Sequence, residues 1–201
     1  MVPLTDTLAR RAIERSVGDR HAEYVEEMQR IIDATYGLIE RTGGLDPSLR
    51  DILRETKLST QAFYKYFQSK DELFLVLLDD GRRQLLDYLA HRMARANTID
   101  GKVRAWIEGV LAQAKRTDVA ARTRPFFANE DRLADAFPDE HRATIDLLID
   151  QLAEVVDRRD AEAVYYLAFG ALHAHLTRRT TPTKTETQRI VRFALHGLGD
   201  A

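Results

Sequence analysis

The sequence of 201 residues predicts an all-α protein. Apolar residues recur every three or four positions along most of the chain, which is the period of one face of an α-helix. Candidate N-caps and Gly or Pro residues separate these stretches at helix-like lengths. No stretch alternates apolar and polar residues as a half-buried strand would.

Composition narrows the class of protein. With 44% hydrophobic and 31% charged residues, the chain is typical of a globular protein with a sizeable core. The absence of cysteine excludes disulfides, zinc–thiolate sites and cysteine nucleophiles. There is no apolar run of about 18 residues and no signal-peptide pattern, so we expect a cytoplasmic protein that does not bind membranes. A formal net charge of −2 still allows a local basic face.

The N-terminal region begins with a stretch that has two interpretations. Residues 1–20 carry a weak apolar stripe and several arginines, so they are either a loosely docked extension or an arm that contacts phosphates. Residues 22–42 have a continuous apolar stripe and predict a helix that Gly43 and Gly44 end. Asp46 then resembles an N-cap, with Pro47 at the first position of a helix over 47–56.

A short helix over about 59–67 follows a turn at 56–59 and has two different faces. The apolar face consists of Ala62, Phe63, Tyr66 and Phe67, and the opposite face of Thr60, Gln61, Tyr64 and Lys65. Residues 47–70 hold five Lys or Arg against two acids, so positive charge is local in a chain of net charge −2. Amides read base edges, while ammonium and phenolic groups hold phosphates, so this stretch indicates a DNA-binding surface.

The remaining helices are marked by their caps and stripes. Ser69 and Glu72 form a capping-box pattern that starts a long helix over 70–96, and Thr183 and Glu186 form another before 183–198. Residues 117–137 are less regular and contain Pro125. The other expected helices are 98–116, 138–158 and 160–178, the last of them capped by Asp160.

The helix over 160–178 differs from the others because Ala161–Leu172 is apolar nearly all round. Such a helix must be buried on every side. We therefore expect it to pair with helix 183–198 of the same chain and with both helices of a second copy. The alternative is a central core helix without dimerisation.

Several spaced residues resemble the helix-turn-helix signature of TetR-family transcriptional regulators. They are Leu58-Ser59, Phe63-Tyr64, Tyr66-Phe67, Ser69-Lys70-Asp71-Glu72-Leu73 and, before them, Ser48-Leu49-Arg50-Asp51-Ile52. The resemblance covers about residues 28–75. It implies a DNA-binding domain over 1–69 and a helical ligand-binding and dimerisation domain over 70–201, which the long helix joins. Two departures stand out: Lys57 replaces the usual turn glycine, and Ala62 replaces a hydroxyl residue.

The resemblance and the outward face together assign roles on DNA. Gln61 and Lys65, beside Thr60, are expected at base edges, and Arg50 is expected in the same groove. Phosphate contacts are expected from Ser48, Tyr64, Tyr66 and Lys70. The implied partner is a double-stranded operator with an inverted repeat, bound by a homodimer through helices 160–178 and 183–198.

The resemblance also implies a repressor that a small apolar ligand releases from DNA. The candidate ligand-binding residues are Trp106, Phe126, Phe127, Tyr165, Phe169 and His173. Aromatic residues at helical spacing equally suit a packed core.

Two other function classes remain open. One is a helical protein-interaction module that does not bind DNA, and the other is a small helical enzyme. No H-E-x-x-H, P-loop or G-x-G-x-x-G pattern occurs, and His173 and His175 are two residues apart, so they cannot share a metal on a helix. We therefore expect no catalytic residues, no metal and no cofactor.

Overall fold

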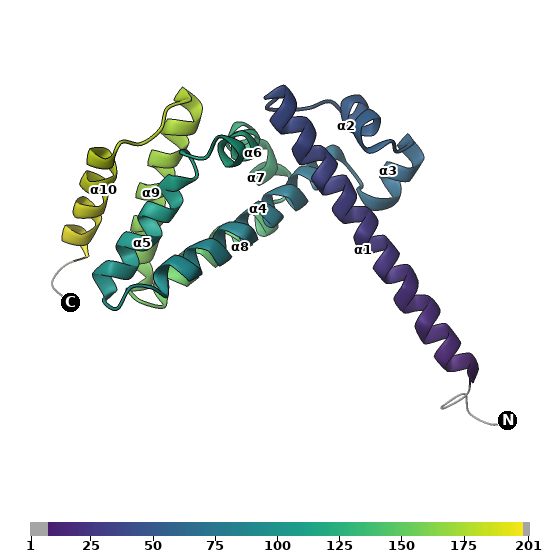
Figure 1. Ribbon diagram of the computed structural model, residues 1–201, viewed down its shortest axis with the longest axis horizontal. Helices are drawn as coiled ribbons and strands as arrows, with labels where there is room; N and C mark the ends of the chain where they lie inside the picture. The colour runs from purple at the N-terminus through teal and green to yellow at the C-terminus, as the bar shows by residue number, and fades with distance from the viewer. Residues whose placement is uncertain (1–7, 199–201) are drawn as a thin grey trace.

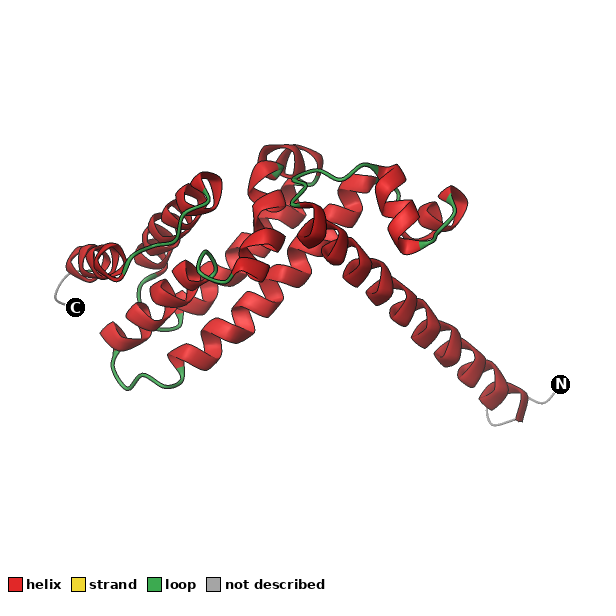
Figure 2. Cartoon of the chain, turned by 45° about the horizontal axis from the view of Figure 1, so that its top comes forward, coloured by secondary structure: helices red, strands yellow, loops and turns green. Residues whose placement is uncertain are grey.

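A computed structural model describes residues 8–198 of the chain. Within this range the secondary structure consists of ten α-helices and no strand (Figures 1 and 2). The predicted all-α class is confirmed. In the part of the chain that the structure describes, no helix is both long and apolar enough to cross a lipid bilayer.

The first helix is longer than expected. Helix α1 runs without a break from Leu8 to Thr42, so the expected separation of an extension over 1–20 from a helix over 22–42 is wrong from residue 8 onward; residues 1–7 lie outside the described range. Residues 8–42 contain no proline, and one interior glycine, such as Gly18, costs a helix only about 1 kcal/mol. The N-terminal half of α1 extends away from the other helices (Figure 1).

Helices α2 (Leu49–Thr56) and α3 (Thr60–Tyr66) form the helix-turn-helix, and each begins at a serine. The Oγ atoms of Ser48 and Ser59 accept hydrogen bonds from the backbone N–H groups of Asp51 and Ala62, at 3.2 and 3.1 Å. The expectation that Asp46 caps α2 with Pro47 as its first residue is wrong. Ser48 has the extended backbone of an N-cap (φ −69°, ψ 153°), so the helix begins one residue after it.

Lys57 ends α2 in the left-handed conformation, with φ 59° and ψ 23°. A residue with a Cβ atom is strained there, whereas glycine is not. We expect Lys57→Gly to raise the free energy of unfolding by up to about 1 kcal/mol. Urea unfolding followed by circular dichroism measures the change, with Lys102→Gly, within a regular helix, as a control that should be destabilised. A Lys57→Gly variant less stable than the wild type contradicts this account of the turn.

A first hydrophobic core lies around the helix-turn-helix. It consists of residues from α1, α2, α3 and the start of α4 (Lys70–Met93), and it also includes Phe126 and Leu133. These two side chains come from α6 (Thr117–Ala128) and α7 (Glu130–Ala136). The core around the helix-turn-helix therefore includes residues from beyond the boundary expected at 69/70.

Helices α6 and α7 replace the irregular stretch expected over 117–137. Pro125 lies inside α6 and is buried, and α6 packs against α1, α4 and α9 (Arg158–Arg178). A proline weakens an isolated helix, but tertiary packing overrides such local preferences. The side-chain amide of Asn129 donates to the carbonyl of Pro125 at 2.7 Å, where α6 meets α7.

The second core lies between α4, α5 (Ile99–Ala112), α8 (Pro138–Ala153), α9 and α10 (Lys184–Gly197). Helix α8 ends at Ala153, before the expected 158, and α9 is capped by Asp157 instead of Asp160; the Asp157 carboxylate accepts from the N–H of Arg159 at 2.8 Å. The capping box of Thr183 and Glu186 at the start of α10 is confirmed.

The start of α4 follows the predicted pattern with one change. Ser69 accepts from the backbone N–H of Glu72 at 3.0 Å, as a capping box requires. The Glu72 carboxylate accepts from the N–H of Gln68 and not from that of Ser69. With Ser69 as its N-cap, α4 begins at Lys70, directly after the loop that follows α3.

Candidate DNA-binding surface and ligand cavity

The outward face of α3 is polar and exposed. Thr60, Gln61, Tyr64 and Lys65 all lie on this face. On the inward side, Phe63 and Phe67 are fully buried and stack in a tilted arrangement with ring centroids 5.4 Å apart. The core behind α3 holds the helix in place, so the four polar side chains are free to contact another molecule. Arg50, on α2, is also exposed.

Tyr66, expected at a phosphate, does not lie on this face. Its side chain is 9% exposed, and its hydroxyl donates to the carboxylate of Glu27 on α1. That hydrogen bond, together with burial, raises the pKa of Tyr66 to about 12. The ring lies 4.9 Å from that of Tyr24, so Tyr66 fastens α3 to α1. The periodicity had placed Tyr66 on the apolar face, and the structure agrees with the periodicity.

Two other expected phosphate contacts have partners within the protein. Ser48 donates to the Asp51 carboxylate at 2.6 Å while it caps α2. The Lys70 ammonium lies 2.6 Å from a carboxylate oxygen of Asp46. Because Lys70 is paired and only partly exposed, its charge is not free for DNA in this conformation. Ala62 is half-buried and carries no hydroxyl, as expected from the departure in sequence.

A cluster of charged residues connects α7 to the loop before α2 and to the start of α4. Arg132 lies 3.1 Å from Asp46 and 2.9 Å from Asp71, and the Asn129 amide donates to the carbonyl of Leu45 at 2.9 Å. Burial alone would raise the pKa of Asp46, but the hydrogen bond and charge of Lys70 outweigh it and the pKa lies below its ordinary value. The stabilisation is therefore present above the ordinary aspartate pKa and is lost as the pH falls through the lowered one.

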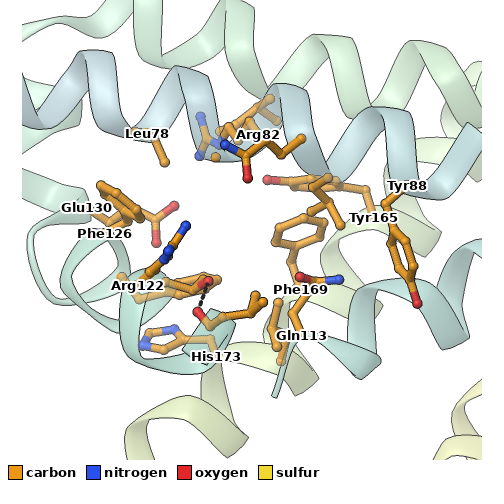
Figure 3. Close-up of a pocket in the computed structure, with 18 of the residues that line it drawn as sticks. Leu78, Arg82, Tyr88, Gln113, Arg122, Phe126, Glu130, Tyr165, Phe169 and His173 are labelled. Atoms are coloured by element: carbon orange, nitrogen blue, oxygen red, sulfur yellow. Dashed lines mark hydrogen bonds between the residues drawn. The ribbon is translucent and has the colours of Figure 1, made fainter. Parts of the chain in front are cut away.

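A cavity of about 500 Å³ opens within the helical region beyond the helix-turn-helix. Its volume lies within the range of small-molecule sites, about 300–1,000 Å³. Helices α4, α6 and α9 supply most of its lining; one residue comes from α1, one from α7 and two from α8 (Figure 3). The same α4 that begins next to α3 therefore forms one wall of the cavity.

Five of the six expected ligand-binding residues line this cavity: Phe126, Phe127, Tyr165, Phe169 and His173. Tyr165 and Phe169 stack with centroids 4.4 Å apart, and Phe127 stacks on His173 at 4.9 Å. Trp106 is not part of the lining. Its indole N–H donates to the Gln151 side chain at 3.2 Å, and the ring is fully buried in the second core.

Polar residues in the lining were not expected from the sequence. Arg82, Glu130 and His141 all face the cavity region, and Arg82 and His141 are buried. For one of them the sequence holds a feature that could have predicted it. Arg82 falls between Leu78 and Leu85 on the apolar stripe of α4, where a charged residue is out of place. Burial lowers the pKa of His141 below its ordinary value, and the charge of Arg82 lowers it further.

Comparison with protein-family models gives one match. Residues 31–77 match the model described as "Bacterial regulatory proteins, tetR family". This range contains α2, α3 and the start of α4. A search of curated protein sequences finds no match.

Solved structures with a similar fold come from several organisms. A protein of Streptomyces coelicolor A3(2) described as a transcriptional regulator superposes with a TM-score of 0.71 at 14% identity, covering 87% of this chain and 99% of that one. A TetR transcription regulator from Haloarcula marismortui gives 0.66 at 18% identity, with coverage of 87% and 97%. The transcriptional regulator FadR from Bacillus subtilis, in complex with stearoyl-CoA, gives 0.60 at 15%, with 86% and 97%. At these identities the similarity shows the fold.

Proposed function

We propose that this chain is a DNA-binding transcriptional regulator of the TetR family, and that it acts as a homodimeric repressor that a small molecule releases from its operator. The observation that carries the proposal is the outward face of α3, where Gln61, Tyr64 and Lys65 are exposed above a fully buried aromatic core. Gln61 and Lys65 are proposed to read bases, and Thr60, Tyr64 and Arg50 to support them from the same surface.

The proposed dimer uses α9 and α10. Helix α9 is not buried on every side within one chain, since Tyr166 is 53% exposed although it lies in the apolar stretch. Phe193 on α10 is 70% exposed, the highest value among the large exposed hydrophobic side chains of the described residues. Exposed aromatic side chains on neighbouring helices favour a protein interface. A twofold dimer would present two α3 helices to an inverted repeat.

The proposed release mechanism relies on contacts between the cavity and the DNA-binding region. Helix α4 runs from the end of the helix-turn-helix along the cavity, and α6 contacts α1 through the ion pair of Arg122 with Glu40. A ligand that favours a position of α4 and α6 in which the two α3 helices do not fit the operator weakens DNA binding by linkage, typically by about 1–3 kcal/mol. A bound small molecule in the similar structure of Bacillus subtilis FadR supports a ligand here.

Selection of bound duplexes from a random-sequence DNA library tests the proposal. Enrichment of an inverted repeat supports a dimer that reads sequence, because two symmetric recognition helices contact two symmetric half-sites. A helical protein-interaction module would enrich no sequence, so an unenriched library would contradict the proposal.

A further inference from the structure

Arg82 is a buried charged residue beside the cavity. It is 9% exposed and lies on α4 in the middle of an apolar stripe. Its two hydrogen bonds both come from Nη1, which donates to the hydroxyl of Thr144 and to the carbonyl of His141 at 3.4 Å. Among the described residues, no carboxylate lies within 4.0 Å of the guanidinium, the limit for an ion pair.

A buried charge without a counter-ion is costly, and arginine keeps its charge in proteins. Burial lowers the pKa of Arg82, and electrostatic interactions with Tyr165, Glu130 and Asp79 act in the opposite direction without outweighing it. A protein normally pairs such a group with a carboxylate of its own. At Arg82 the polar partners are neutral, so the guanidinium retains capacity for an anion that enters the cavity.

The other two arginines in the cavity lining already have carboxylate partners. Arg116 pairs with Asp118 at 2.9 Å, and Arg122 pairs with Glu40. Glu130 lies 3.8 Å from the imidazole Nε2 of His141 and is more exposed than Arg82. Of the three arginines in the lining, Arg82 is therefore the one without a paired carboxylate within the described residues.

The surroundings of Arg82 show what kind of anion would fit. The hydroxyl of Tyr165 points towards the same part of the cavity (Figure 3), and burial raises the pKa of Tyr165 to about 12, so it stays protonated and able to donate. The lining also includes three phenylalanines, Phe126, Phe127 and Phe169, and Phe169 stacks on Tyr165. The cavity thus offers two donors for an anion together with aromatic surface for an apolar body.

We propose that the cavity binds a carboxylate with an apolar body, with the carboxylate on Arg82 and the Tyr165 hydroxyl and the body against the phenylalanines. The inference rests on the proposed ligand site and names the chemical class that fills it. The planar guanidinium matches a carboxylate in geometry as well as charge. Since Arg82 is part of α4, the ligand would act on the helix that begins at the DNA-binding region.

Isothermal titration calorimetry with three ligands of similar shape tests the proposal: decanoate, decanamide and decylammonium, each below its micelle concentration. They differ in head-group charge and share a chain. The wild-type protein is expected to bind decanoate about tenfold to a hundredfold more tightly than decanamide, because hydrogen bonds to a charged group are the stronger ones. In Arg82→Gln this preference should disappear.

Arg83→Gln is the matched control. Arg83 is the next residue on α4, but its side chain is exposed and pairs with Asp79 outside the cavity lining, so decanoate affinity should stay within about twofold of the wild type. If Arg82→Gln fails to fold, Tyr165→Phe serves instead. It keeps the ring and removes one donor, and should weaken decanoate about twofold to tenfold.

Equal affinity for decanoate and decanamide would overturn the inference, as would unchanged decanoate binding in Arg82→Gln or no binding of decanoate at all. Tighter binding of decylammonium would assign the head-group position to Glu130 instead. The titration contains no DNA, so its outcome is separate from that of the proposed function. A carboxylate-binding protein that enriches no DNA sequence contradicts only the regulator proposal.

Discussion

Replacing Gln61 or Lys65 with alanine is expected to weaken binding to the preferred operator by about 1–3 kcal/mol, roughly 5- to 150-fold, and to relax base preference at particular positions. Both side chains are exposed on the outward face of α3, one helical turn apart. A Gln amide pairs with adenine, and a Lys ammonium contacts guanine, at base edges in the major groove. Binding to unrelated duplexes should change little from the loss of Gln61, because non-specific affinity comes mainly from phosphate contacts.

Tyr64→Phe is the matched control on the same face. It removes only a hydroxyl that is proposed to hold a phosphate, so it should weaken all sequences alike and keep the base preference. Fluorescence anisotropy against a panel of single-base operator variants, at several salt concentrations, separates the two effects. The assignment fails if Gln61→Ala and Lys65→Ala leave every base preference intact, or if Tyr64→Phe changes one.

Phe193→Asp is expected to convert the dimer to monomers at micromolar concentration and to reduce operator affinity by a factor of about 100 or more. A central aromatic residue in an interface commonly contributes about 2 kcal/mol or more, and a charge buried in its place costs further free energy. Phe193 is 70% exposed in the single chain, so the substitution should leave the monomer folded. Light scattering gives the mass, and anisotropy gives the DNA affinity.

Leu147→Asp is the control for the interface. Leu147 is also an exposed apolar residue, but it lies on α8 and not on the proposed interface. This variant should remain dimeric. A dimer that survives Phe193→Asp and dissociates with Leu147→Asp would place the interface on α8 and contradict the use of α9 and α10.

The sequence predicted most accurately the parts where local signals agree with packing. The two faces of α3 follow from its periodicity, and the capping box of Thr183 and Glu186 marks the start of α10 correctly. At these places the side-chain pattern and the backbone cap indicate the same helix. The assignment of Tyr66 to a phosphate came from family resemblance and conflicted with the periodicity, which had placed the ring in the core.

The predictions that were wrong concern segments whose local structure depends on distant parts of the chain. Pro125 suggested an irregular segment, but the packing of α6 against α1, α4 and α9 keeps it helical. Asp157 and Asp160 are both acceptable caps in sequence, and only the end of α8 at Ala153 decides between them. Aromatic residues likewise suggest a cavity or a core equally well, so Trp106 and Phe169 could be told apart only in three dimensions.

The periodicity alone could not show the charged side of the cavity. It places Arg82 on the apolar stripe of α4, but only the structure shows that the side chain is buried there. Its burial depends on Thr144 and His141, which are about 60 residues away in the chain. Long-range partners of this kind give no local signal in a single sequence.

Selection of bound duplexes from a random-sequence library with the wild-type protein, followed by sequencing, tests directly whether the protein is a homodimer that reads DNA sequence. We predict enrichment of two copies of one short sequence in inverted orientation, with a fixed spacing, since two α3 helices related by a twofold axis would contact the two half-sites. Enrichment of no sequence at low salt, or of a single sequence without inverted symmetry, would contradict a sequence-reading homodimer.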